Sequence, residues 1–246
     1  MIIQIYEIQT PKEAEKCIKL GVNHIGSVIL AEDEWRQSLL REVVKLSNGT
    51  IVKNSIIPLF TNLDNIYRSL DYYQPDFLHL CDSLTDERGR QLEINNFFDF
   101  QLRIKEKFPE IKILRSIPVP DKESDQEFPT LKIAANLEPV SDLFLTDTWL
   151  KQEPVSGFIG ITGRTCDGQT AKELVNQSRI PVILAGGLSP ENVYEVLMEI
   201  TPAGADSCTL TNLTDREGAP VRFKKDFSRV KQFVAEIKRA EQDGEK

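Results

Sequence analysis

The chain has 246 residues, of which 40% are hydrophobic and 28% are charged, and its formal net charge is −8. This length suits one domain with a sizeable core, and the acidic balance argues against a nucleic-acid-binding surface, which needs a basic footprint. No apolar run reaches the ~18–20 residues that span a bilayer, and the first residues lack the basic and apolar regions of a signal peptide. The four cysteines have no paired spacing, which favours reduced thiols in the cytoplasm over a disulfide framework or a metal site.

Strand and helix patterns alternate along the whole chain. Short apolar runs predict strands at residues 2–6, 24–30, 56–60, 76–80, 111–117, 142–146, 181–184 and 205–208. Helical patterns follow them at residues 10–20, 36–46, 62–72, 91–107, 131–137, 170–177, 190–200 and 226–240. Eight such units predict the α/β class and a single (β/α)8 TIM barrel over residues 1–246, with a doubly wound open sheet as the alternative. The proline-rich and charged segment 118–129 is predicted to be an exposed loop.

Two glycine-containing segments, 160–165 and 181–192, predict a phosphate-handling site. In the second segment a buried strand runs into Gly186 and Gly187, and Ser189 then provides a helix N-cap. Glycines at such a turn let backbone N–H groups approach an anion, and a helix N-terminus adds partial positive charge. In a barrel enzyme, ligands bind at this C-terminal end of the strands.

These segments resemble corresponding parts of the phosphoribosylanthranilate isomerase family, as do residues 10–14, 20–26 and 144–148. The resemblance is collinear over most of the chain and is weakest at 82–111 and 118–129. It implies one barrel that catalyses an Amadori rearrangement of an aminoaldose phosphate in tryptophan biosynthesis, without a metal or organic cofactor. A phosphorylated small molecule is then the expected partner, and the protein is expected to be a monomer or a homodimer, with no nucleic-acid or membrane partner.

The family resemblance assigns the general acid to Asp147, at the end of the sixth predicted strand; a capping or turn aspartate is the alternative. The family's general base is less clear in this chain. The family pattern Lys-Ile-Cys-Gly-Ile-Thr becomes Gln-Ile-Tyr-Glu-Ile-Gln at residues 4–9, so that Tyr6 and Glu7 become the candidate catalytic residues. A phenol of pKa ~10 is a weak base near neutral pH, and Tyr6 could simply fill the barrel mouth. Strand alternation places Glu7 opposite Tyr6.

Two further strand ends depart from the family pattern. Gln-Leu-His-Gly becomes His-Leu-Cys-Asp at residues 79–82, where Cys81 and Asp82 could supply a relocated base. Alternatively, His79 is a core histidine bonded to a backbone carbonyl, and Cys81 is a small apolar side chain. At the eighth strand, Asp-x-Ser-Ser-Gly becomes Asp-Ser-Cys-Thr-Leu at residues 206–210, which removes a glycine that allows close backbone approach.

The resemblance also implies a set of substrate- and phosphate-binding residues. Two of its members have simpler explanations, because Arg36 could be an exposed residue at a helix start and Arg164 could form a surface ion pair of little energetic weight. The full predicted set is Arg36, Gly163, Arg164, Gly186, Gly187, Asp206 and Thr209.

Three functions remain open at the level of sequence. The first is a family isomerase with an unusual base, and the second is a diverged barrel enzyme that acts on another sugar phosphate. The third is a catalytically silent protein that binds a phosphorylated ligand. Loss of a general base typically removes 10²–10⁴-fold of rate, so its absence alone would leave weak turnover.

Overall fold

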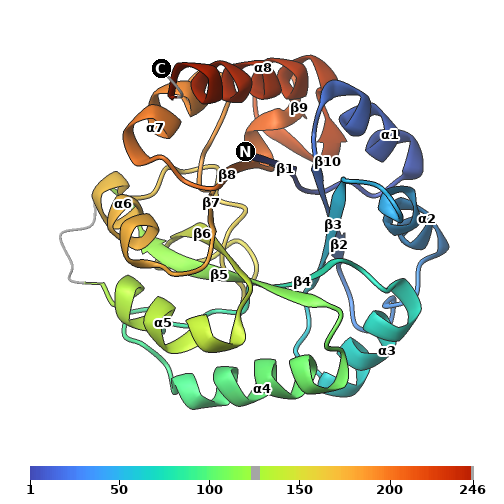
Figure 1. Cartoon of the computed structure of the whole chain (residues 1–246), viewed down its shortest axis with the longest axis vertical. Coiled ribbons are helices and arrows are strands. Elements are labelled where there is room, and N and C mark those ends of the chain that lie inside the picture. The colour runs from blue at the N-terminus through green and yellow to red at the C-terminus, as the bar shows by residue number, and fades with distance from the viewer. Residues whose placement is uncertain (123–127, 245–246) are drawn as a thin grey trace.

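The computed structural model describes residues 1–122 and 128–244. Within these ranges, eight parallel strands pair in the order β1 to β8 and close into a barrel. Figure 1 looks along the barrel, with the strands at the centre and helices α1 to α8 around them. The predicted (β/α)8 barrel is therefore confirmed, and the open sheet is excluded because β8 pairs with β1. That a single domain extends over all of residues 1–246 stays a prediction.

The strands and helices alternate as the sequence predicted, with small changes in their bounds. The barrel strands are β1 Ile2–Ile5, β2 His24–Ile29, β3 Lys53–Pro58, β4 Phe77–Leu80, β5 Lys112–Pro120, β6 Leu143–Trp149, β7 Val182–Leu184 and β8 Gly204–Ser207. The helices are α1 Pro11–Leu20, α2 Ser38–Ser47, α3 Leu63–Tyr73, α4 Ile94–Lys107, α5 Thr130–Leu137, α6 Gly168–Gln177, α7 Val193–Ile200 and α8 Phe227–Gly244.

Local capping chemistry explains where the helices begin and end. Thr10 and Glu13 form a capping box at the start of α1, and Gly21 ends it in the left-handed conformation with φ +101°. Helix α7 starts later than predicted, at Val193. The reason is that the Asn192 side chain accepts a hydrogen bond from Ser189 N–H and donates one to the Gly187 carbonyl, which holds the preceding residues in a turn.

Two segments that were predicted as loops, or given no predicted element, contain strands. β5 runs on to Pro120, so the first part of segment 118–129 is strand, and residues 123–127 of that segment lie outside the described residues. Between β8 and α8 the chain forms an antiparallel hairpin that was not predicted, made of β9 Asn212–Thr214 and β10 Pro220–Lys225. Figure 1 shows this hairpin between α8 and α1. The hairpin lies beside the end of β1 at the barrel mouth, where it binds the Glu7 side chain.

Alternation along the strands produces two kinds of core. Side chains that point outward pack between strands and helices, whereas inward-pointing side chains fill the barrel. The inward cluster is Tyr6, Val28, Phe77, Leu114, Leu143, Leu145, Ile183 and Ala185. Buried polar side chains, among them Gln4, Ser55, His79 and Ser116, lie among the barrel strands.

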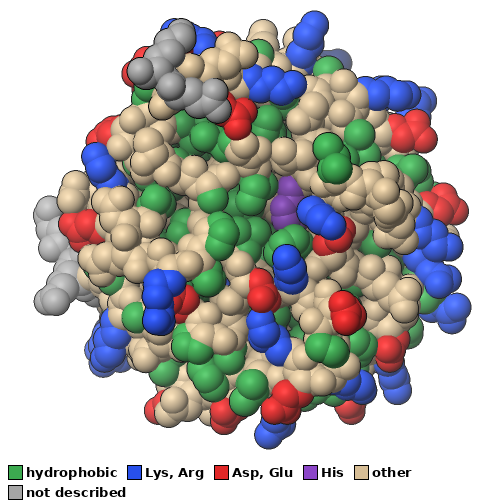
Figure 2. Space-filling view, viewed as in Figure 1, with side chains coloured by type: hydrophobic (Ala, Val, Ile, Leu, Met, Phe, Trp, Pro, Cys, Tyr) green, Lys and Arg blue, Asp and Glu red, His purple; other side chains and the backbone are tan. Residues whose placement is uncertain are grey.

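The surface carries no broad region of one charge on the face that Figure 2 shows. Basic and acidic side chains are interspersed around its rim, and hydrophobic side chains gather near its centre. Across the described residues, no helix is both long enough and apolar enough to cross a membrane.

Candidate active site at the barrel mouth

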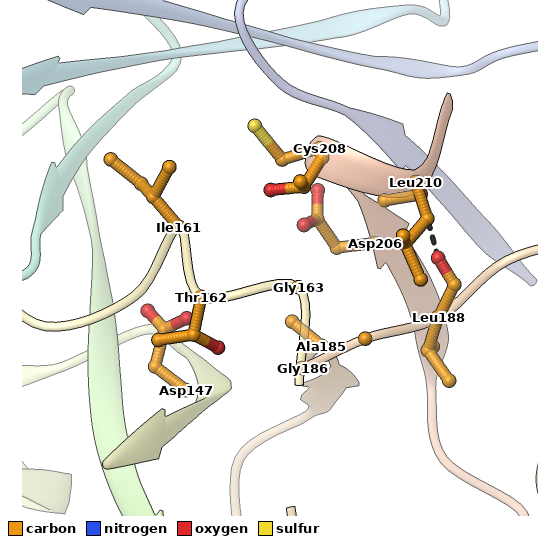
Figure 3. A pocket seen from close by; sticks show the side chains of 13 residues that line it. Asp147, Ile161, Thr162, Gly163, Ala185, Gly186, Leu188, Asp206, Cys208 and Leu210 are labelled. Carbon is orange, nitrogen blue, oxygen red and sulfur yellow. Dashed lines mark hydrogen bonds between the residues drawn. The ribbon is translucent and has the colours of Figure 1, made fainter. Parts of the chain in front are cut away.

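Two adjoining cavities occupy the C-terminal end of the barrel, where loops follow the strands. The loop cavity, of about 40 Å³, lies between the loops after β6, β7 and β8. The barrel cavity, of about 50 Å³, extends toward β1 and β4. Both cavities are lined by Asp147, Ile161, Asp206 and Cys208. Figure 3 shows the Asp147 and Asp206 carboxylates on opposite sides of the loop cavity, with Thr162 and Gly163 on the loop nearby.

Asp147 has the environment of a general acid. It lies near the end of β6, and its Oδ2 accepts a hydrogen bond of 2.6 Å from the Ser116 hydroxyl. Burial raises the pKa of Asp147 to about 7, against the lowering effect of that hydrogen bond, and the nearby Glu153 carboxylate raises it further. A carboxyl group with a pKa near neutrality can hold a proton for delivery and can lose it in one step.

The loop after β6, residues 150–167, covers this acid. Ile159 N–H donates to the Cys81 carbonyl at 2.9 Å, and a β-bridge joins Phe158 to Asp82. A Cβ on Gly160 would lie 2.7 Å from Asp147 Oδ1, so only glycine lets the loop backbone approach the carboxylate so closely. The loop thus removes Asp147 from bulk water, which is the main cause of its raised pKa.

Gly186 and Gly187 serve the packing of two loops. A Cβ on Gly186 would lie 2.4 Å from Thr148 Oγ1, and one on Gly187 would lie 2.7 Å from the Arg164 backbone. Both glycines have positive φ, 96° and 63°. The turn after β7 is therefore pressed against the loop after β6, and both glycines line the loop cavity together with Gly163.

The β8 side of the loop cavity supplies a carboxylate and a hydroxyl. Asp206 is buried, and its Oδ1 has no hydrogen-bond partner among the described residues. Burial raises the pKa of Asp206 well above its usual range, and the Asp147 carboxylate adds to that rise. Thr209 and Cys208 line the same cavity from the turn after β8. The structure thus brings five of the predicted binding residues to one cavity: Gly163, Gly186, Gly187, Asp206 and Thr209.

The two predicted arginines lie elsewhere. Arg36 is exposed and stacks over the Tyr72 ring at 4.9 Å, on the outer helical layer, and it lines neither cavity. Arg164 is adjacent to the loop cavity, but its Nε forms an ion pair of 2.8 Å with Asp121 Oδ2. Arg36 is therefore not brought to the site, and its stacking matches the alternative of a surface residue.

Tyr6 and Glu7, the two candidates for the base, have opposite orientations. The Tyr6 side chain points into the barrel, where its hydroxyl lies 2.6 Å from Ser55 Oγ and 2.5 Å from His79 Nδ1. Burial raises the pKa of Tyr6 well above its usual range. His79 is bonded to side chains and not to the backbone carbonyl that the sequence suggested.

The Glu7 carboxylate faces the β9–β10 hairpin. It accepts hydrogen bonds from Arg222 Nε at 2.7 Å, from Phe223 N–H at 3.1 Å and from Asn212 Nδ2 at 3.2 Å. Burial alone would raise the pKa of Glu7, but these donors and the Lys225 charge lower it below its usual range. Glu7 thus stays ionised and fully engaged, which suits an anchor for the hairpin better than a base.

The Tyr6 ring depends on a glycine in the neighbouring strand. A Cβ on Gly26 would lie 2.3 Å from ring carbons of Tyr6, whose hydroxyl is held in place by two hydrogen bonds. We expect Gly26→Ala to lower the free energy of unfolding by about 1–3 kcal/mol through overpacking, measured by denaturant titration. In a Tyr6→Ala background the same change is expected to have less than half this effect. Equal losses in the two backgrounds would show that the ring is not the obstacle.

Sequence reasoning missed two polar residues of the site. Ser116 lies on β5 and joins His79 to Asp147, with 2.8 Å between its Oγ and His79 Nε2. Its signal was a hydroxyl in an apolar strand, with the same parity as the inward Leu114. Glu153 lies on the covering loop and has a pKa raised to about 7 by burial. Among the described residues, no three His, Cys, Asp or Glu side chains group in a way that could hold a metal ion.

The fold and this mouth define a (β/α)8 barrel of the kind that binds its ligand at the C-terminal ends of the strands, with a partly buried carboxylic acid facing the two cavities. A family model described as N-(5'phosphoribosyl)anthranilate (PRA) isomerase matches residues 4–208. The chain therefore belongs to the N-(5'-phosphoribosyl)anthranilate isomerase family.

Individual relatives agree with this assignment. The N-(5'-phosphoribosyl)anthranilate isomerase of Methanocella arvoryzae is 31% identical over 239 residues, which cover 96% of this chain and 97% of the relative. The isomerase 1 of Methanosarcina mazei is 22% identical over 244 residues, covering 96% and 94%.

Solved structures agree in fold. Phosphoribosyl anthranilate isomerase from Thermus thermophilus superposes with a TM-score of 0.67 at 17% identity, covering 97% of this chain and 99% of that chain. An isomerase structure in complex with reduced 1-(o-carboxyphenylamino)-1-deoxyribulose 5-phosphate gives a TM-score of 0.65 at 17% identity, with the same coverage.

Proposed function

We propose that this chain isomerises N-(5'-phosphoribosyl)anthranilate to its aminoketose by an Amadori rearrangement, the reaction of tryptophan biosynthesis that its family resemblance implies. The observation that carries the proposal is Asp147, a partly buried carboxyl group with a pKa of about 7 that faces two adjoining cavities. Its pKa lets it protonate the ribose ring oxygen and open the ring at neutral pH. Membership of the family, over residues 4–208, supplies the substrate class.

The loop cavity is the proposed phosphate site. Its glycines, Gly163, Gly186 and Gly187, line the cavity, and they let the turn after β7 pack closely against the loop after β6. Thr209 offers a hydroxyl from the β8 side in place of the glycine that the family pattern has there. Arg164 lies beside the cavity and is placed to contribute positive charge, shared with Asp121. Asp206 faces the sugar side, where its raised pKa lets it donate as well as accept a hydrogen bond.

The barrel cavity is the proposed site of proton removal from C2′. Tyr6 and His79 line its floor, and Asp147 lines its opposite side. Glu7, which also borders this cavity, is held by three donors from the hairpin, so we assign it to the support of the mouth. A diverged barrel that acts on another sugar phosphate is the second candidate, because Tyr6 and the turn after β8 both depart from the family pattern.

The experiment that tests the proposal is fluorescence-monitored turnover of freshly generated phosphoribosylanthranilate by the purified protein. A rate above the no-enzyme control that scales with protein concentration is the expected result. Asp147→Asn protein serves as the matched control, since it keeps the fold and removes the acid. Absence of any protein-dependent rate would refute the proposed reaction and favour the second candidate, which a panel of phosphorylated aldoses would then test.

A further inference from the structure

A continuous line of hydrogen bonds crosses the inside of the barrel. The Tyr6 hydroxyl lies 2.5 Å from His79 Nδ1, His79 Nε2 lies 2.8 Å from Ser116 Oγ, and Ser116 Oγ donates to Asp147 Oδ2 at 2.6 Å. The four side chains come from the end of β1 and from β4, β5 and β6. They connect the position where the family pattern has its cysteine with the proposed acid.

When Asp147 is ionised, the donor and acceptor groups of these side chains fix the direction of all three hydrogen bonds. Asp147 as a carboxylate can only accept, so the Ser116 hydroxyl donates to it and must accept from His79 Nε2–H. Neutral His79 then has a free Nδ1 lone pair, which accepts the Tyr6 O–H. Burial and the nearby Arg115 and His24 side chains lower the pKa of His79 well below its usual range, which keeps the ring neutral.

We propose that Tyr6, His79 and Ser116 form a proton relay that carries to Asp147 the proton removed from the substrate. This inference rests on the proposed function. Tyr6 is the catalytic residue that meets C2′, whereas His79 and Ser116 are positioning and relay residues that act between Tyr6 and Asp147. No residue of the relay has been assigned this role by the family pattern, in which the corresponding positions hold cysteine and glutamine at strands one and four.

The proton count closes over one turnover. Asp147 gives its proton to the ring oxygen, and the C1′–O bond breaks as the substrate nitrogen forms a C=N bond. The Tyr6 phenolate then takes the C2′ proton, and the C–H electron pair becomes the C1′=C2′ bond of an enolamine. The enzyme is left with a Tyr6 phenol and an Asp147 carboxylate. Concerted transfer of one proton along each of the three hydrogen bonds restores the phenolate and the protonated acid.

The surrounding charges affect both ends of the relay. Glu153, Asp206 and Cys81 face Asp147 from the covering loop, β8 and β4, while Arg115 is paired with Asp82 beside His79. The reactive form, with a phenolate and a protonated acid, is a minor tautomer, because the pKa of Tyr6 lies above that of Asp147. The relay therefore predicts slow turnover compared with the ~10 s⁻¹ of a typical enzyme.

Substitutions that keep the hydrogen bonds but stop proton exchange test the relay. His79→Gln can accept from Tyr6 and donate to Ser116, yet an amide does not shuttle a proton. We expect kcat to fall at least 30-fold with KM within threefold, and Ser116→Ala to act similarly. Ser116→Thr keeps the hydroxyl and is expected to retain activity within fivefold. The matched control is Ser69→Ala, which removes a buried hydroxyl that donates to the Asn65 carbonyl within α3, away from the relay, and should stay within threefold.

A second measurement needs no turnover. Nitrogen-15 NMR of the substrate-free protein is expected to show a neutral His79 from pH 5 to 9, with its proton on Nε2 above pH 7, where Asp147 is ionised. Tyr6→Phe is expected to change the Nδ1 signal, since it removes the donor. A proton on Nδ1 above pH 7, or a ring that titrates near pH 6.5, would overturn the relay even in an active enzyme.

The two proposals fail in distinguishable ways. If the wild-type protein turns over and His79→Gln keeps more than half of its kcat, the relay is refuted and the proposed function still holds. A wild-type protein without turnover refutes the proposed function, and the NMR result alone then decides whether the directional hydrogen-bonded line exists.

Discussion

Asp147→Asn is expected to lower kcat by about 10²–10⁴-fold, the usual contribution of a general acid. The amide keeps the shape of the carboxyl group and can accept the hydrogen bond from Ser116, but it has no proton to give to the ring oxygen. The pH profile provides a second sign of the same role. Because the reactive form has the same number of protons as the enzyme with a Tyr6 phenol and an Asp147 carboxylate, kcat/KM of the wild-type protein should rise as the pH passes the Asp147 pKa of about 7 and then level off.

The same substitution is expected to stabilise the protein at alkaline pH. The pKa of Asp147 is about 7 in the folded state and ~3.9 in an unfolded chain, so ionisation opposes folding as the pH rises from 4 to 7. Above pH 7 the variant should gain on the order of 4 kcal/mol of unfolding free energy, and the gain should vanish below pH 4. Denaturant titration at pH 5 and pH 8 measures the difference.

Glu153→Gln is the matched control for the loss of activity. Glu153 is a second, partly buried carboxyl group with a pKa of about 7, and it raises the pKa of Asp147. Its removal is expected to keep activity within a few-fold and to shift the rise in kcat/KM to slightly lower pH. A loss of activity as large as that of Asp147→Asn would mean that the acid is not Asp147 alone.

Arg222→Ala is expected to lower the free energy of unfolding by about 3 kcal/mol at pH 7. The Glu7 side chain is only 1% exposed, and the guanidinium of Arg222 is the cation that pairs with it at 2.7 Å. Without this partner a buried carboxylate remains, which usually costs several kcal/mol. The pKa of Glu7 is lowered in the folded state, so this stabilisation is present above pH 4.5 and is lost as the pH falls below it.

Glu7→Gln separates the charge from the packing. The amide removes the buried charge, and Arg222, whose side chain is 38% exposed, can turn to water, so we expect a loss of about 1 kcal/mol. The double variant should be no less stable than Arg222→Ala. Urea titrations of the four proteins give the coupling energy between the two residues, and a coupling near zero would show that the ion pair does not hold the hairpin.

The sequence predicted the barrel because its signals are local. Apolar runs, caps such as Thr10 and the terminating Gly21 recur with the period of a βα unit, and eight units close a barrel. Asp147 and the Gly186–Gly187 turn could also be placed, since strand ends meet at one edge in a parallel barrel. All three now lie against one cavity.

The remaining features depend on contacts that a single sequence does not show. Glu7 points away from Tyr6, as strand alternation predicted, but the hairpin some 200 residues away in the chain that binds its carboxylate had no signal in the sequence. Nothing in the sequence around Arg36 distinguished a substrate contact from the stacking on Tyr72 that the structure shows. Tyr6 and His79 were each recognised as departures from the family, yet their meeting depends on the width of the barrel between β1 and β4.

The link between Glu7 and the β9–β10 hairpin also bears on the order in which the molecule is assembled. The Glu7 carboxylate lies near the N-terminus, whereas its hydrogen-bond donors Arg222 and Phe223 lie on the β9–β10 hairpin. These hydrogen bonds can therefore form only after the hairpin has been synthesised. The Met1 amino group has a similar partner in Glu241, on the last helix. A nascent chain that stops before Arg222 would therefore lack the hairpin side of the barrel mouth, and its Glu7 carboxylate would be without these donors. Proteolytic cleavage or truncation before Arg222 should likewise separate the hairpin from Glu7.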